Sequence, residues 1–104
     1  MENINFKNIQ SAVINVDNST DTTRVYDISA RVSLDNKGEA NSIDNGSILK
    51  DKNNVGGFSS YSTQNMSINY NGVKQEEQEI ILSTVNAFVA SIREYCTNHT
   101  LIWN

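Results

Sequence analysis

The only thiol and the only imidazole of the chain, Cys96 and His99, lie three residues apart, and the Glu94 carboxylate is close by. A thiol, an imidazole and a carboxylate can together form a nucleophilic catalyst. However, Cys96 also continues an apolar helical stripe, which predicts a small buried side chain. His99 would stand at a helix C-terminus, where a cation is favoured without any catalytic role. No nucleophile-elbow or oxyanion motif accompanies these residues, so we predict no catalytic residues.

Metal and phosphate chemistry also find little support in the residue spacing. One His and one Cys cannot supply a structural zinc site within one chain. The segment 51–62 starts like a calcium-binding loop, but Val55 and Ser62 stand where oxygen ligands are needed, so we interpret it as a turn. Gly56-Gly57 fits neither of the common phosphate-binding motifs. We therefore expect no cofactor and no metal.

The charge balance argues against nucleic acid as a partner. The 8 Lys and Arg residues are scattered and are outnumbered by 12 Asp and Glu, for a formal net charge of −4. A phosphate-binding surface needs a basic patch, which this pattern does not predict. Glu76, Glu77 and Glu79 could be general acid–base residues, but at a helix start they are more typical of a solvated first turn.

Composition also bears on the compartment. A single cysteine allows no disulfide within the chain, which favours a reducing environment. No uninterrupted apolar run, such as Ile80–Leu82, approaches the ~18 residues that a membrane span requires. The polar start Met1–Asn5 does not resemble a secretory signal. We expect a cytoplasmic protein that does not enter a membrane.

The predicted secondary structure changes from strands to a helix at about residue 72. Period-two alternation is clearest from Tyr26 to Leu34 and is typical of a strand with one buried face. The segment 39–49 is so polar that an edge strand, a short hairpin turning at Asp44–Gly46 and a loop all remain open. A meander and a Greek key fit the pattern equally well. We predict strands at about 4–16, 24–34, 39–49 and 57–70.

A single helix is predicted from about residue 74 to 97. Its apolar positions repeat at intervals of three and four and form one stripe, made of Ile81, Leu82, Val85, Phe88, Val89, Ile92, Tyr95 and Cys96. At 1.5 Å per residue it would be about 36 Å long, which matches a strand of roughly eleven residues. We predict an α+β fold in a single domain, 1–104. A four-stranded, or five-stranded, antiparallel sheet in its N-terminal part is covered on one face by this long C-terminal helix.

Some apolar residues remain without a place in this core. Val13, Val25 and Tyr61 have the opposite parity to the main clusters, and Ile102 and Trp103 follow the helix. Such residues could make a second apolar face that pairs with a copy of the chain or with a partner, or they could be scattered singly. The residues that we predict to contact another protein are Phe58, Tyr61, Ile102 and Trp103.

By elimination, we expect a non-enzymatic protein–protein interaction module that binds a partner or itself, as a homo-oligomer. Small size and an Asn-rich composition without proline are compatible with a phage or mobile-element accessory protein that binds a host factor. The order of elements, antiparallel strands and then a long helix, resembles the export chaperone SecB and implies, as an alternative, a holder of unfolded chains. A third alternative is a small enzyme whose site is shared across an oligomer interface, with Tyr26, Tyr61, Tyr70, Arg31 and His99 as its polar residues.

Overall fold

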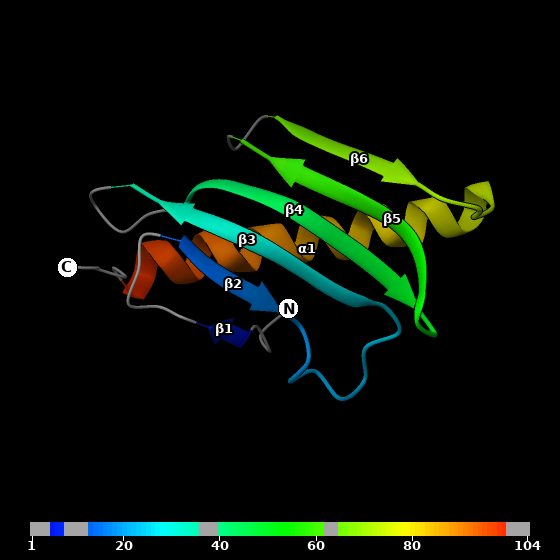
Figure 1. The fold of residues 1–104 in the computed structure, drawn as a ribbon, viewed down its shortest axis with the longest axis horizontal. Helices are drawn as coiled ribbons and strands as arrows, with labels where there is room; N and C mark the ends of the chain where they lie inside the picture. The colour runs from blue at the N-terminus through cyan, green and yellow to red at the C-terminus, as the bar shows by residue number, and fades with distance from the viewer. Residues whose placement is uncertain (1–4, 8–12, 36–39, 62–64, 100–104) are drawn as a thin grey trace.

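The fold is an antiparallel sheet with one helix packed on it, and this confirms the predicted α+β class (Figure 1). The computed structural model describes residues 5–7, 13–35, 40–61 and 65–99. In chain order the elements are β1 (Asn5–Lys7), β2 (Val13–Asp17), β3 (Asp27–Leu34), β4 (Ala40–Lys50), β5 (Asn53–Ser60), β6 (Met66–Tyr70) and α1 (Gln75–His99).

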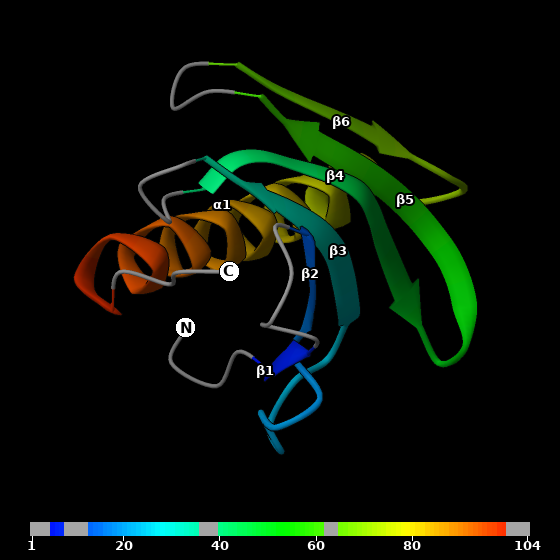
Figure 2. The ribbon, with the colours of Figure 1, turned by 60° about the vertical axis from the view of Figure 1, so that its left-hand side comes forward.

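The six strands form a meander in which each strand pairs with its neighbour in sequence. The Greek key alternative is therefore wrong. The expected strand 4–16 covers β1 and all but the last residue of β2, and the expected strand 57–70 contains the end of β5 and all of β6. Within the described residues the sheet consequently has six strands, where four or five were expected. Figure 2 shows that it curves over the helix.

The strand β4 corrects the prediction for segment 39–49. It is a continuous strand between β3 and β5, not an edge, a hairpin or a loop. Asn45, with φ at 52°, forms a bulge between the Ile43↔Ser60 and Gly46↔Phe58 pairs. The extra residue reverses the alternation, so that Ile43 and Ile48 both face the helix and are fully buried. The bulge thus places apolar residues with an odd spacing in the sequence on the same face of the sheet.

The connection between β4 and β5 is a tight two-residue turn. Asp51 and Lys52 both have positive φ, at 51° and 69°, between the paired residues Lys50 and Asn53. Two successive left-handed residues define the type I′ turn, whose twist suits a hairpin. The chain therefore turns within the segment that was predicted to be a turn rather than a calcium loop.

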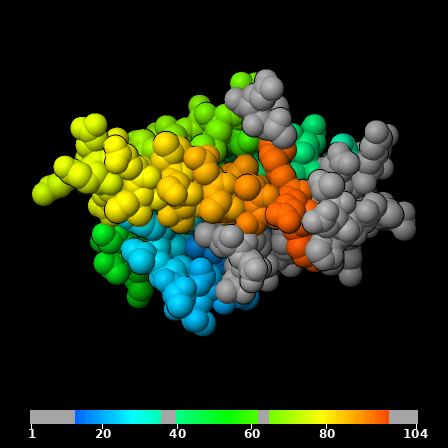
Figure 3. All heavy atoms as spheres, turned by 180° about the vertical axis from the view of Figure 1, so that it is seen from behind, coloured from blue at the N-terminus to red at the C-terminus, as the bar shows by residue number. Residues whose placement is uncertain are grey.

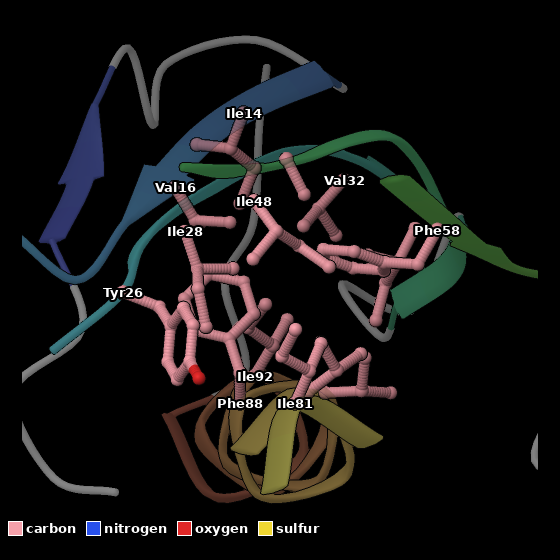
Figure 4. Close-up of a cluster of buried hydrophobic side chains, with 14 of the residues drawn as sticks. Ile14, Val16, Tyr26, Ile28, Val32, Ile48, Phe58, Ile81, Phe88 and Ile92 are labelled. Carbon is pink, nitrogen blue, oxygen red and sulfur yellow. The ribbon is translucent and has the colours of Figure 1, made fainter. Parts of the chain in front are cut away.

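The core lies between the concave face of the sheet and α1, as Figure 4 shows. The helix stripe predicted from the sequence points into it, and six of its residues are buried: Ile81, Val85, Phe88, Val89, Ile92 and Cys96. Phe88 meets Phe58 of β5 edge to face, with ring centroids 6.1 Å apart. Burial of each such side chain contributes about 1.5–3 kcal/mol, so this contact holds the helix to the sheet.

A buried amide, Asn18, continues the β2–β3 pairing beyond the end of β2. Its side-chain oxygen accepts the Ile28 N–H at 3.0 Å, and its side-chain nitrogen donates to the Tyr26 carbonyl at 2.8 Å. Its own backbone N–H donates to the Ile28 carbonyl. Asn18 therefore satisfies backbone groups that would otherwise be buried without partners, and it fixes the entry of the chain into β3.

Candidate functional site

Two exposed aliphatic side chains from distant parts of the sequence line one hollow beside the N-terminal half of α1. Val25, just before β3, is 65% exposed, and Ile80, in the second turn of the helix, is 57% exposed. Both line one open hollow of about 440 Å³, which we call the Val25–Ile80 notch; it is lined by Val25, Tyr26, Lys50, Lys74, Glu76, Glu77 and Ile80. In Figure 3, the light blue segment leading into β3 lies beside the yellow first half of the helix.

A network of polar groups ties three elements together in the notch. The Tyr26 hydroxyl donates to Oε2 of Glu77 at 2.8 Å, and Lys50 Nζ forms an ion pair with the same oxygen at 2.8 Å. The Lys50 ammonium also lies 5.9 Å from the centroid of the Tyr26 ring. Tyr26 lies just before β3, Lys50 is the last residue of β4, and Glu77 is in the first turn of α1. Because the network joins these three elements, it fixes the shape of the hollow around the two aliphatic residues.

The protonation states of this network follow from its contacts. Burial, followed by the hydrogen bond to Glu77 and its negative charge, raises the pKa of Tyr26 to about 12. Hydrogen bonds from Lys50 and then from Tyr26 lower the pKa of Glu77. The Glu77 carboxylate is therefore charged and the Tyr26 phenol neutral at physiological pH, which makes Tyr26 a fixed donor rather than a base.

The Tyr26–Glu77 contact gives a testable dependence on pH. A raised phenol pKa stabilises the fold at pH values below the ordinary value of 10.0, and this contribution is lost as the pH rises through about 12. Glu77→Gln removes the carboxylate's charge, so we expect the pKa of Tyr26 to fall part of the way towards 10.0. Tyrosinate absorbance, with Tyr26→Phe to identify the signal, measures it.

Glu76→Gln is the matched control for that titration, because Glu76 lies on the same helical turn and makes no hydrogen bond to Tyr26 in the structure described. The control should leave the Tyr26 titration unchanged. Ionisation of the wild-type Tyr26 near 10.0 would show that neither its burial nor its contact with Glu77 persists in solution.

The candidate nucleophile is not set up for attack. Cys96 is fully buried under the sheet, and burial raises the pKa of its thiol to about 11. A thiol is a weak nucleophile until it is deprotonated, so Cys96 acts here as a small apolar side chain. The Glu94 side chain is exposed, and the placement of the His99 side chain lies outside what the structure describes.

The polar residues of the enzyme alternative do not come together. Tyr26 is in the notch, whereas Arg31 lies on the opposite, outer face of the sheet in a bidentate pair with Asp44, at 2.9 and 3.2 Å. Tyr61 is exposed at the end of β5, and Tyr70 is half-buried in β6. These tyrosines and Arg31 form no common site in this chain.

The residues predicted to contact other proteins have different outcomes. Phe58 is only 5% exposed and packs against Phe88 in the core, so it offers little surface to another protein, and its predicted role as a contact stays a prediction. Tyr61 is exposed, as its parity indicated. Ile102 and Trp103 lie outside the described residues, and their predicted role as contacts stays a prediction.

Sequence reasoning found one half of the notch and missed the other. Val25 stands out by its parity, and the structure shows it exposed. Ile80 was missed, although a signal exists: it lies outside the stripe of Ile81, Val85 and Phe88, and Glu79 precedes it. An aliphatic residue on the charged side of an amphipathic helix is a sequence signal for an exposed apolar contact, and this signal could have identified Ile80.

The outer face of the sheet is polar. Its side chains are mainly Asn and Ser, with the Arg31–Asp44 pair near the middle, and two shallow hollows of about 390 and 300 Å³ meet at Asn45. Among the described side chains, Val13 of β2 is the large aliphatic residue exposed on this face. The described part of this face therefore shows no extended apolar surface.

The fold and the notch together define an α+β protein with a six-stranded meander, one covering helix and an aliphatic hollow with a charged rim. Comparisons of the chain with protein-family models, with curated proteins and with solved structures give no match. Within the described ranges, no helix is both long enough and apolar enough to cross a bilayer. The same ranges contain no group of three or more His, Cys, Asp or Glu residues that could hold a metal ion.

Proposed function

We propose that this protein is a non-enzymatic protein–protein interaction module that binds its partner through the Val25–Ile80 notch. The observation that carries the proposal is that two exposed aliphatic side chains, Val25 and Ile80, line the same hollow. Exposed aliphatic residues that occur singly need no explanation, but neighbouring ones with a polar rim are typical of protein-binding surfaces. The Tyr26–Glu77–Lys50 network supports it, because a surface that is already ordered loses less entropy on binding.

The lining of the notch indicates the chemistry of the partner. Its apolar part would take an aliphatic side chain between Val25 and Ile80. Its rim carries two lysines and two glutamates, Lys50, Lys74, Glu76 and Glu77, so it favours neither a strongly acidic nor a strongly basic partner. The partner we propose is therefore a protein surface that inserts one aliphatic side chain and offers groups of both signs around it.

The small size and proline-free, Asn-rich composition extend the proposal to a cytoplasmic accessory protein, of phage or mobile-element type, that binds a host protein. The two alternatives have less support. A holder of unfolded chains would need a long apolar surface, whereas the outer sheet face is polar. A shared enzyme site would have to form from residues that lie on opposite faces of the sheet.

The test compares three forms of the protein in affinity capture from the source cells, followed by binding measurements with the purified partner. The notch variant carries Val25→Glu and Ile80→Glu, and the control carries Val13→Glu, which changes an exposed valine elsewhere. We expect the wild type and the control to retain the same protein and the notch variant to bind it at least about tenfold more weakly. Unchanged affinity of the notch variant, or no retained partner, would overturn the proposal.

A further inference from the structure

The strand β6 forms one margin of the sheet. It pairs antiparallel with β5, from Gly56↔Tyr70 to Ser60↔Met66, and no other strand of the described residues pairs with it. Figure 1 shows it as the outermost strand, at the top of the view. An edge strand presents a row of backbone N–H and C=O groups that a further strand can bind.

The hydrogen bonds at the two ends of the hairpin show which of these groups face outward. Tyr61 N–H donates to the Asn65 carbonyl, and Asn71 N–H donates to the Val55 carbonyl. Bonded and non-bonded pairs alternate along an antiparallel ladder, so Ser67 and Asn69 also bond to β5. The N–H and C=O groups of Met66, Ile68 and Tyr70 therefore point away from β5, towards the open side.

The side chains of this edge do not protect it. Natural edges carry lysine, proline or bulges that prevent pairing with other chains. β6 contains none of these, and its register with β5 is regular. The whole segment 53–73 contains no charged residue. Met66, Ile68 and Tyr70 are packed against the core but remain half-buried, so a neighbour on this side would cover more of them.

We propose that β6 pairs antiparallel with β6 of a second copy of this chain, with Ile68 on the two-fold axis. Ile68 then lies opposite the partner's Ile68, and Met66 lies opposite the partner's Tyr70. Every outward N–H and C=O of these three residues has a partner in this register. On the helix side, half-buried apolar side chains meet their equivalents, and on the outer side Ser67 meets the partner's Asn69.

The edge is self-complementary, which favours a second copy as its occupant, because all the outward groups of Met66, Ile68 and Tyr70 pair in one two-fold register and segment 53–73 brings no like charges into the contact. Two molecules that each carry a formal charge of −4 repel one another, and a contact centred on an uncharged segment keeps their carboxylates apart. The two-fold axis is perpendicular to the sheet, so the two six-stranded sheets become continuous and both helices lie on the same side. The edge and the Val25–Ile80 notch are separate observations, and either proposal can fail alone.

The test introduces charges at Ser67 and Asn69, whose side chains are exposed and outside the core. In the proposed register, residue 67 faces residue 69 of the other copy. The double variant S67K/N69K therefore places like charges opposite each other twice, and S67K/N69E places opposite charges there. Sedimentation equilibrium of wild type and both variants over micromolar to millimolar protein measures the dissociation constant, with circular dichroism to confirm that each variant is folded.

We expect a dimer for the wild type, dissociation that is about tenfold easier for S67K/N69K, and recovery of the dimer for S67K/N69E. A wild-type protein that stays monomeric at all these concentrations would overturn the proposal. The edge strand would then be available for pairing with a strand of another protein. A dimer that S67K/N69K does not weaken would show that the contact lies elsewhere. If S67K/N69E is weakened as much as S67K/N69K, the register centred on Ile68 is wrong.

Discussion

Replacement of Phe88 by alanine is expected to lower the free energy of unfolding by about 3–5 kcal/mol. Phe88 is fully buried, and its ring stands at 82° to that of Phe58 across the helix–sheet contact. The variant loses the burial of the ring and leaves a cavity that the rigid sheet cannot fill. Since small domains are stable by only about 5–15 kcal/mol, the helix would be held weakly or not at all.

Urea unfolding followed by circular dichroism measures this loss. Phe88→Leu is the matched control, because it keeps most of the apolar volume and should cost clearly less than the alanine variant. A loss below about 1 kcal/mol for Phe88→Ala would mean that the helix does not pack on the sheet in the way described.

Replacement of Asn18 by alanine is expected to cost about 2–4 kcal/mol, although Asn18 is a polar residue in a turn segment. The change leaves the Ile28 N–H and the Tyr26 carbonyl without the amide that binds them. Because both groups lie at a buried position, water cannot easily replace it. The effect should therefore approach that of a core substitution.

Asn15→Ala is the control, since Asn15 is an exposed asparagine of the adjoining strand β2, and its replacement should change the stability by no more than about 0.5 kcal/mol. Thermal unfolding of both variants under the same conditions decides the matter. Equal stability of the two variants would show that the buried amide is not needed for entry into β3.

The elements that sequence could predict are those whose burial follows a regular period. The stripe from Ile81 to Cys96 and the alternation from Tyr26 to Leu34 are both seen as expected. The period fails in β4, where the Asn45 bulge places Ile43 and Ile48 on one face despite their odd spacing. No alternation rule can locate such a bulge in advance. Asn18 was missed for a related reason, because turn chemistry does not distinguish an exposed asparagine from a buried one.

The contact residues were harder to predict because exposure depends on neighbours in space. Phe58 has the parity of the core, yet Ser59 and Ser60 dilute its surroundings in sequence. In the structure it lies opposite Gly46, where an added Cβ would approach its ring to 2.5 Å. Because glycine has no side chain, the Phe58 ring can occupy the space above Gly46, and the two positions depend on each other for packing. The notch could not be assembled from sequence, because nothing local links Val25 to Ile80.

The meander also has a consequence for synthesis of the chain. Each strand finds its partner immediately before it in sequence, so the sheet can grow hairpin by hairpin as residues leave the ribosome. The helix α1 follows the strands in the sequence. The apolar face of the nascent sheet is therefore uncovered until the helix has been synthesised. A pause in translation before the helix would therefore leave the apolar face of the sheet exposed for longer and favour aggregation of the nascent chain.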